Sequence, residues 1–296
     1  MNNIIQTAHK CIACGASGQT LKTKPAFLMP FVANRVFGWE PFKIEKSFGY
    51  KDVKPGWAYP LCNSVACTNC GLIFSDIRFT DEQMSALYEG YRGHEYVIQR
   101  KKFERNYNEQ EKTPLNYIVV KENFIKKSLS SESPLAILDW GGDTGQSVVF
   151  NDGVNDVFSY DVGRPRPLQN NVKRFDIGSD KKFDLITCSH VLEHVPYPIN
   201  FVAELKKFLK TDGVIFFELP MERIMDPSKN STIEEQLSAK HHWHEHINFF
   251  SINSLEHVFS NSGFDILDFS LVKVDAPGNF DSVVMANLCK SATRCN

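Results

Sequence analysis

The residues best suited to chemistry form a short run rich in histidine. Residues 240–251 read Lys-His-His-Trp-His-Glu-His-Ile-Asn-Phe-Phe-Ser, with four histidines and one glutamate inside six positions. An imidazole titrates near neutral pH and can take a proton from a substrate, while a neighbouring carboxylate orients it. We expect His246 to be the base, Glu245 to orient it, and Trp243 and His244 to contact the substrate. A metal site and a plain surface loop are the alternatives.

Two Cys-x-x-Cys pairs form a second group of reactive side chains. Cys11 and Cys14 make the first pair, Cys67 and Cys70 the second, and a glycine follows each pair. Two such turns supply the four sulfur ligands of a tetrahedral structural zinc. Cys62 is close enough in sequence to replace one of them. Disulfides, a redox dithiol and buried free thiols are the alternatives to Zn2+.

A glycine-rich turn follows a short apolar strand in the middle of the chain. Residues 135–139 read Leu-Ala-Ile-Leu-Asp, and Gly141, Gly142 and Gly145 come next, where the backbone can approach a ligand closely. A second expected strand, at residues 157–161, ends in the carboxylate of Asp161. A glycine turn followed by an acid about twenty residues later suits a ribose held by its hydroxyls.

This turn resembles the first motif of class I S-adenosylmethionine-dependent methyltransferases. The family's D-x-G-x-G-x-G pattern falls on Asp139, Gly141, Asp143 and Gly145, so Asp143 stands where the family has glycine. A non-glycine residue at positive φ is strained, although Asp tolerates it better than most residues. A tight turn without a ligand is the alternative interpretation.

The resemblance extends downstream and implies how S-adenosylmethionine is held. Asp161 would bind the ribose, Asp176 and the neighbouring Ile177 would lie near the adenine, and Ser189 and His190 would lie near the methionine part. The stretch Phe-Asp-Leu-Ile at 183–186 followed by Leu-Glu-His-Val at 192–195 is similar to the family's fourth-strand motif. The cofactor set is therefore Asp139, Gly141, Gly142, Gly145, Asp161, Asp176, Ile177, Ser189 and His190.

Alternating strands and helices predict an α/β fold: a doubly wound, seven-stranded, Rossmann-like methyltransferase core with a small N-terminal zinc-binding domain. We expect the zinc-binding module at 1–78, a helical bridging or lid region at 79–130, and the core at 131–296. The bridge contains a helix at 81–88 capped by Thr80, and then Tyr91 as a substrate contact. The further expected elements are strands at 171–177, 183–189, 214–220, 264–269 and 282–288, and a helix at 199–209.

The cysteine module, the methyltransferase core and a Glu-His-x-x-Phe-Phe-Ser run at 245–251 together resemble the deoxysugar C-methyltransferases. Those enzymes carry a Tyr-x-Glu-His motif whose histidine is the proposed base. The tyrosine position is Trp243 here, and a tryptophan cannot act as a phenolic acid. The family also has a further C-terminal domain, for which we expect no counterpart here. The resemblance implies C- or O-methylation of a sugar or nucleotide-linked sugar.

Composition sets the remaining expectations. The chain has 296 residues, a formal net charge of −2, and no apolar run long enough to cross a bilayer. We therefore expect a cytoplasmic protein with a small-molecule acceptor, no membrane contact and no nucleic-acid partner, because a basic aromatic stripe is missing. The sequence leaves a homodimer open. A non-catalytic binding protein on the same fold and an RNA methyltransferase are the alternatives.

Overall fold

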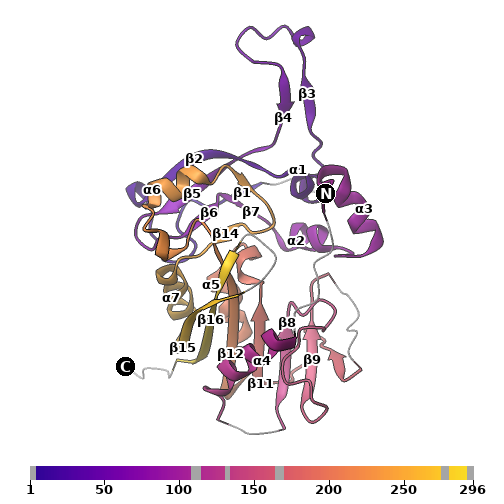
Figure 1. Cartoon of the computed structure of the whole chain (residues 1–296), viewed down its shortest axis with the longest axis vertical. Helices are drawn as coiled ribbons and strands as arrows, with labels where there is room; N and C mark the ends of the chain where they lie inside the picture. Colours follow the sequence, from indigo (N-terminus) through magenta and orange to yellow (C-terminus); the bar gives the residue numbers. More distant parts are fainter. Residues whose placement is uncertain (1–4, 108–114, 131–133, 164–169, 275–279, 292–296) are drawn as a thin grey trace.

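The structure is a computed structural model of the chain, and it describes residues 5–107, 115–130, 134–163, 170–274 and 280–291. Two β-sheets dominate the molecule, one in its lower half and one in its upper half (Figure 1). No helix within the described residues combines the length and the apolar character needed to span a bilayer. The loop between the upper-sheet strands at 242–243 and 248–249 reaches Glu222 of the lower sheet, where the two halves meet.

The lower sheet has seven strands in the order β10-β9-β8-β11-β12-β16-β15. Neighbouring strands are parallel from β10 to β12, whereas β16 is antiparallel to both β12 and β15. This arrangement confirms the predicted seven-stranded α/β core. Its strands are β8 (Ala136–Trp140), β9 (Asp156–Tyr160), β10 (Val172–Arg174), β11 (Phe183–Ser189), β12 (Leu209–Glu222), β15 (Phe264–Lys273) and β16 (Phe280–Lys290).

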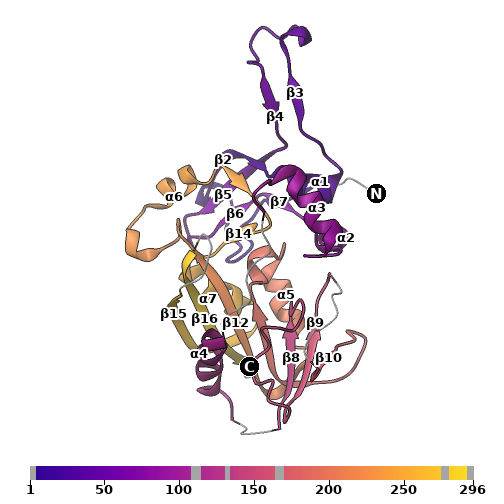
Figure 2. The ribbon, with the colours of Figure 1, turned by 45° about the vertical axis from the view of Figure 1, so that its right-hand side comes forward.

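Side chains that alternate along these strands bury both faces of the sheet. In β12, Phe216 contacts Phe124 of α4 with ring centroids 6.1 Å apart, whereas the next residue, Phe217, contacts Phe259 of α7 at 5.2 Å. Helix α4 therefore covers one face, and α5 and α7 cover the other (Figure 2). The helices are α1 (Pro30–Phe37), α2 (Asp81–Tyr88), α3 (His94–Phe103), α4 (Leu115–Lys126), α5 (Pro198–Leu205), α6 (Ile233–Ala239) and α7 (Ile252–Asn261).

The connections on the β8–β9–β10 side differ from the doubly wound expectation. Residues 141–155 and 175–182, all of which the structure describes, contain no helix. Aromatic rings pack against one another there instead: Phe175 lies with its ring centroid 5.1 Å from Phe183 and 5.5 Å from Phe208. Helix α5 is also shorter than the predicted 199–209, because β12 begins at Leu209.

The upper sheet has five strands in the order β13-β2-β5-β6-β14. Its outer strands come from residues that follow β12, so the chain returns to the N-terminal module after building most of the core. A separate hairpin, β3–β4, projects from the top of the molecule (Figures 1 and 2). The strands of this half are β1 (Gln6–Thr7), β2 (Leu21–Leu28), β3 (Phe42–Ile44), β4 (Gly56–Ala58), β5 (Leu61–Cys67), β6 (Ile73–Ser75), β7 (Ile77–Arg78), β13 (His242–Trp243) and β14 (Asn248–Phe249).

Helices α2 and α3 of the bridging region pack against α1 of the module. The predicted cap of α2 is confirmed: Thr80 Oγ1 accepts a hydrogen bond from the Gln83 backbone N–H, and the Gln83 side chain accepts one from the Thr80 N–H. The described part of the chain also contains four short 3-10 helices, namely η1 (Gly18–Thr20), η2 (Lys46–Phe48), η3 (Leu192–His194) and η4 (Pro227–Lys229).

Candidate functional site

The glycine turn lies at the carboxyl end of β8 and packs tightly against its neighbours. A Cβ added at Gly142 would lie 2.4 Å from Ser159 Oγ and 2.5 Å from Asp139 Oδ2. Gly141 has φ +77°, and a Cβ there would lie 2.4 Å from Val191 Cγ2. Both positions therefore require glycine, because the backbone approaches β9 and the loop after β11 too closely for any side chain.

Asp143 and Asp161 connect the turn to the end of β9. Asp143 adopts φ 48°, so the departure from glycine does place a non-glycine residue in the left-handed region. Its backbone N–H donates to Asp161 Oδ2 at 3.0 Å, and the Gly163 N–H donates to Asp161 Oδ1 at 2.7 Å. Burial raises the pKa of Asp161, although these two N–H groups oppose the shift. Each carboxylate oxygen keeps a lone pair for a further donor.

The bridging region reaches over the glycine turn. Arg92 forms an ion pair with Asp143 at 2.8 Å, and a Cβ added at Gly163 would lie 2.8 Å from the Tyr88 carbonyl oxygen. Tyr91 is half-buried, with its ring packed edge-on against Tyr88 at 5.5 Å between centroids. The bridging segment around Tyr88 and Arg92 therefore contacts the glycine turn and the residues that follow β9.

The other expected cofactor residues end their strands at the same edge of the sheet. Asp139 is buried and accepts a hydrogen bond from Thr187 Oγ1 at 2.6 Å. Asp176 and Ile177 are exposed just beyond β10, and Ser189 ends β11. His190 follows with φ 54°. The structure thus brings the nine expected residues together along one edge, because parallel strands end on the same side.

A buried ionic network lies beside this edge and was not anticipated from the sequence. Glu218 of β12 is fully buried, 3.2 Å from Lys121 Nζ and 3.4 Å from His190 Nε2, and it accepts a hydrogen bond from the Tyr117 hydroxyl. Burial alone would raise the pKa of Glu218, but Lys121 and His190 hold it well below its usual range. A glutamate in the otherwise apolar run 214–219 is the signal that could have revealed this network.

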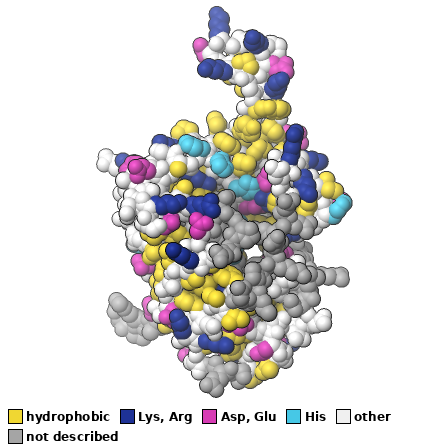
Figure 3. Space-filling view, in the orientation of Figure 1, with side chains coloured by type: hydrophobic (Ala, Val, Ile, Leu, Met, Phe, Trp, Pro, Cys, Tyr) yellow, Lys and Arg dark blue, Asp and Glu magenta, His cyan; other side chains and the backbone are white. Residues whose placement is uncertain are grey.

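Trp243 is not placed where a substrate could reach it. It is fully buried in β13, where its indole N–H donates to Ser64 Oγ at 2.8 Å and its ring packs against Phe249. The expectation for this residue is therefore wrong, because strand pairing with β2 turns the ring into the core of the module. Histidine side chains gather on the surface at the level of the upper sheet (Figure 3).

Glu245 does not orient His246. Its carboxylate accepts hydrogen bonds from the Tyr96 hydroxyl at 2.8 Å and from Arg100 at 2.9 Å, facing α3. The carboxylate that bonds His246 is Glu222, whose Oε1 lies 2.7 Å from His246 Nδ1. The side chains of Glu245 and His246 point to opposite sides of the loop. Their proximity in sequence therefore predicted the wrong carboxylate partner for His246.

His244 also faces the bridging region. Its Nε2 lies 2.6 Å from Glu104 and its Nδ1 lies 3.4 Å from Glu245. Burial opposes protonation, but the hydrogen bonds with these two carboxylates raise the pKa of His244 to about 9. His244 is therefore a charged member of an ion-pair network. Both of its ring nitrogens face carboxylates of the protein, whereas the sequence predicted a contact with the substrate.

His246 instead lies beside two residues of η3 that the sequence analysis did not select as catalytic. Its ring centroid is 4.7 Å from that of His194, at an interplanar angle of 80°. Glu193, the residue before His194, is buried, and its carboxylate lies within 4.0 Å of the rings of His194 and His246. Burial and the neighbouring His246 lower the pKa of His194 to about 4, so this imidazole is neutral at pH 7. The motif Leu-Glu-His-Val was the available signal.

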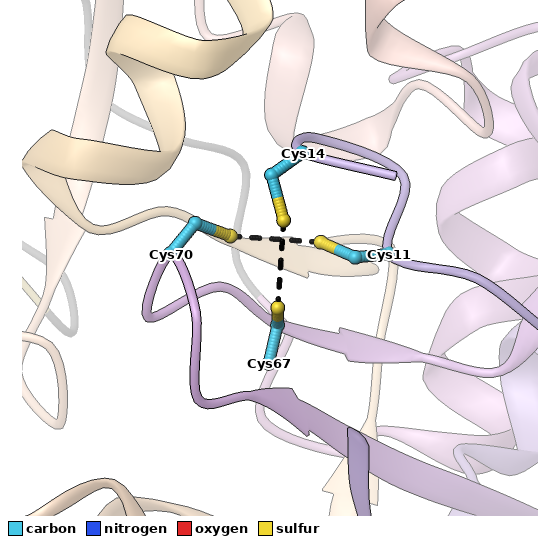
Figure 4. Close-up of side chains that lie close together, drawn as sticks. All are labelled: Cys11, Cys14, Cys67 and Cys70. Atoms are coloured by element: carbon cyan, nitrogen blue, oxygen red, sulfur yellow. Dashed lines mark hydrogen bonds between the residues drawn. The ribbon is translucent and has the colours of Figure 1, made fainter. Parts of the chain in front are cut away.

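The four predicted zinc ligands converge between the loop before β2 and the turn that joins β5 to β6 (Figure 4). Cys11 Sγ lies 3.5 Å from Cys70 Sγ, and Cys14 Sγ lies 3.6 Å from Cys67 Sγ. Four sulfurs at about 2.3 Å from a tetrahedral zinc are about 3.8 Å apart, so the geometry fits Zn2+ closely. Cys62 is buried elsewhere in β5 and is not one of the four.

Comparison with known proteins identifies the family. A family model described as a methyltransferase domain matches residues 107–268, which is more than half of the chain. The chain belongs to the methyltransferase domain family. The matched residues include strands β8 to β12 and the glycine turn that follows β8.

Curated relatives match this chain over a short segment only. A ubiquinone biosynthesis O-methyltransferase from Pasteurella multocida (strain Pm70) is 53% identical over 51 residues, which is 17% of this chain and 21% of that protein. The protein of the same name from Actinobacillus pleuropneumoniae serotype 5b (strain L20) is 54% identical over 37 residues, 12% of this chain and 16% of its own length. The matches thus span about a fifth of these relatives.

Solved structures resemble the chain more distantly. The plantazolicin methyltransferase BpumL, solved with a desmethylPZN analog and SAH, is 14% identical, covering 72% of this chain and 97% of that one with a TM-score of 0.45. The 1,6-didemethyltoxoflavin-N1-methyltransferase from Burkholderia thailandensis is 13% identical, covering 63% and 94% with a TM-score of 0.40.

Proposed function

We propose that this protein transfers a methyl group from S-adenosylmethionine to a small-molecule acceptor. The observation that carries the proposal is the position of Asp161: it directly follows β9, beside a glycine turn in a seven-stranded sheet, and it accepts a hydrogen bond from the Asp143 N–H of that turn. S-adenosylmethionine supplies an electrophilic methyl group on a sulfonium. The acceptor class we favour is a sugar or nucleotide-linked sugar, methylated at carbon or oxygen.

The cofactor would be held by the edge residues. Asp161 has lone pairs left for the ribose hydroxyls, and Asp176 and Ile177 are exposed next to it at the end of β10. Gly141 and Gly142 bring the backbone close without side chains, while Arg92 holds the bridging segment over the turn. These residues would exclude water and align the methyl group, which is most of what in-line transfer requires.

His246 is the residue we assign to the acceptor, and Glu222 takes the orienting role first given to Glu245. The Glu222 carboxylate only accepts hydrogen bonds, so it fixes the proton of a neutral His246 on Nδ1 and leaves Nε2 with its lone pair. Nε2 can then take a proton from an acceptor hydroxyl or carbon acid. About a third of the His246 side chain is exposed, so an acceptor can reach it.

The cysteine cluster is proposed to hold a structural Zn2+. Its four sulfurs would fill the tetrahedron, leaving no position for a substrate. Three of the four cysteines are buried, and the backbone around them bonds to α7 through Ser251 Oγ, which donates to the Cys70 carbonyl oxygen at 2.6 Å. The metal would therefore fix the module against the methyltransferase core.

Isothermal titration with S-adenosylmethionine and S-adenosylhomocysteine tests the cofactor site. We expect micromolar binding by the wild type and at least a ~10-fold loss in Asp161→Asn, because a charge-assisted hydrogen bond is worth ~1.5–3 kcal/mol. Asp156→Asn is the matched control: it removes a carboxylate from the opposite end of β9, where Lys173 and Lys181 bind it at the surface. Equal affinity in the two variants would remove Asp161 from the site.

Turnover tests the reaction itself. Formation of S-adenosylhomocysteine is measured with a panel of nucleotide-linked sugars and phenols, the phenols because the matched relatives are O-methyltransferases. We expect His246→Ala to keep cofactor affinity and lose at least ~100-fold in kcat with the accepted substrate. Cofactor binding without turnover on any acceptor would instead favour a non-catalytic binding protein, and full activity of His246→Ala would reject the assignment of this residue.

A further inference from the structure

Three side chains from two separate loops converge beside the glycine turn. Glu193 and His194 belong to η3, after β11, and His246 belongs to the loop between β13 and β14. Their ligand atoms all lie within 4.8 Å of one another. His194 Nε2 is 3.8 Å from Glu193 Oε1, and His246 Nε2 is 4.0 Å from the same oxygen. These separations are too long for hydrogen bonds, so the three groups surround a common point without bonding to each other.

Hydrogen bonds on the far side of each ring leave both Nε2 atoms free to face Glu193. His246 Nδ1 lies 2.7 Å from Glu222, which can only accept a proton. His194 Nδ1 lies 2.9 Å from the Glu245 carbonyl oxygen, which only accepts, and 2.9 Å from the Tyr88 hydroxyl, which can accept as well as donate. A ring that donates from Nδ1 in its neutral form carries a lone pair on Nε2. A carboxylate or carbonyl behind the distal nitrogen is the arrangement that orients metal-binding histidines.

Glu193 is the buried charge at the centre of this cluster, and within the described chain it lacks hydrogen bonds. Its side chain is 2% exposed, and neither carboxylate oxygen has a hydrogen-bond partner among the residues that the structure describes. Buried carboxylates are ordinarily paired, hydrogen-bonded or bound to a metal. His190 Nδ1 approaches one oxygen to only 3.5 Å. This ion pair partly balances the buried charge, and the Nε2 atoms of His194 and His246 also face the carboxylate, at 3.8 and 4.0 Å.

We propose that Glu193, His194 and His246 bind a divalent transition-metal ion, with Zn2+ as the first choice. Ligand atoms at about 2.1 Å from a tetrahedral zinc are about 3.4 Å apart, so closing the two observed gaps needs movements of only a few tenths of an ångström. Three protein ligands leave a fourth position open. This site differs in kind from the cysteine cluster, whose four sulfurs would complete their tetrahedron.

The role of this metal rests on the proposed function, whereas its binding does not. The site lies two residues from Val191, which contacts the glycine turn at Gly141, so an acceptor oxygen on the open position would be close to the cofactor edge. Coordination lowers the pKa of a bound hydroxyl. The hydroxyl proton would leave to solvent, the oxygen would form a bond to the methyl carbon, and the carbon–sulfur bond would break with its electrons on sulfur. His246 would then act as a ligand instead of as the base.

Zinc stoichiometry tests the proposal without any substrate. The full chain, stripped by a chelator and titrated with Zn2+, is expected to take up two equivalents. Glu193→Gln keeps the side-chain volume and should retain the first equivalent but bind the second at least ~100-fold more weakly. His242→Ala is the matched control, because it removes an exposed histidine of the same run that lies outside the cluster.

Cobalt substitution assigns each equivalent to its ligands. Co2+ in the cysteine cluster gives strong sulfur-to-metal charge-transfer absorption, whereas the second equivalent should add only weak bands from nitrogen and oxygen ligands. Retention of the first equivalent shows that Glu193→Gln is folded. One equivalent in the wild type, or two unchanged equivalents in Glu193→Gln, would overturn the proposal. Loss of cofactor binding with both zinc equivalents intact would overturn the proposed function but leave the metal site.

Discussion

The stability cost of Asp143 can be worked out from its conformation and contacts. Its φ of 48° costs a residue with a Cβ ~1 kcal/mol relative to glycine. The ion pair with Arg92 lies between side chains that are 32% and 18% exposed, so it returns ~0.5 kcal/mol. One carboxylate oxygen, Oδ1, is buried without a hydrogen-bond partner in the described part of the chain. The ion pair therefore offsets only part of the cost.

Two substitutions separate these contributions. Asp143→Ala loses the ion pair and the buried oxygen but keeps the strained φ, so we expect it to lower the free energy of unfolding by ~0.5–1 kcal/mol. Asp143→Gly loses the same two groups and also relieves the strain, so its net effect should be near zero. The glycine variant should therefore melt ~2–4 °C above the alanine variant in a calorimetric scan at pH 7.

Cofactor affinity provides the second readout. Both variants retain the backbone N–H that donates to Asp161, so we expect the Kd for S-adenosylmethionine to change less than ~threefold. Arg92→Met, combined with Asp143→Ala in a double-mutant cycle, should give a coupling of ~0.5 kcal/mol. An alanine variant that melts at or above the glycine variant would show that residue 143 is not in the left-handed region, and the reasoning would be wrong.

Three further predictions concern the rest of the molecule. Cys67→Ser should remove one zinc per chain, measured by mass spectrometry of the metal content, and lower Tm by more than ~5 °C. The pKa of His244 is raised to about 9 from 6.5, mainly by Glu104 against the effect of burial. Its contribution to the unfolding free energy, measured by denaturant titration, should be full below pH 6.5 and lost as pH rises through 9, and His244→Gln should flatten this dependence. Lys121→Met leaves Glu218 buried with fewer partners and should cost ~3 kcal/mol by the same titration, a loss that adding Glu218→Gln should partly restore.

The sequence predicted the core sheet well, because parallel strands carry strong local signals. Apolar runs ending in a polar residue located β8, β9 and β11, and the glycine turn located the edge where they end. Loops carry much weaker signals. Phe175 packs against Phe183 and Phe208 beside a connection that contains no helix, and no periodicity in the sequence distinguishes such packing from that of ordinary core residues.

The candidate site was predicted only in part, because its partners come from distant segments. The histidine run was found, but Glu222, 24 positions before His246, supplies the orienting carboxylate, and Glu245 faces the other way. Trp243 was expected to contact the substrate as part of that run, whereas strand pairing with β2 buries it. The partners of these side chains depend on the side of the loop to which each one points. A sequence motif does not specify that direction.

The interleaved strands of the upper sheet have a consequence for how the protein can be divided. Because β13 and β14 belong to a sheet whose other strands lie before residue 76, a cut anywhere between residues 79 and 241 would separate them from their partners. The loop that carries His246 is anchored at both ends in that sheet, while its imidazole reaches Glu222 of the methyltransferase core. Neither half can therefore be excised or exchanged as one continuous piece of the chain.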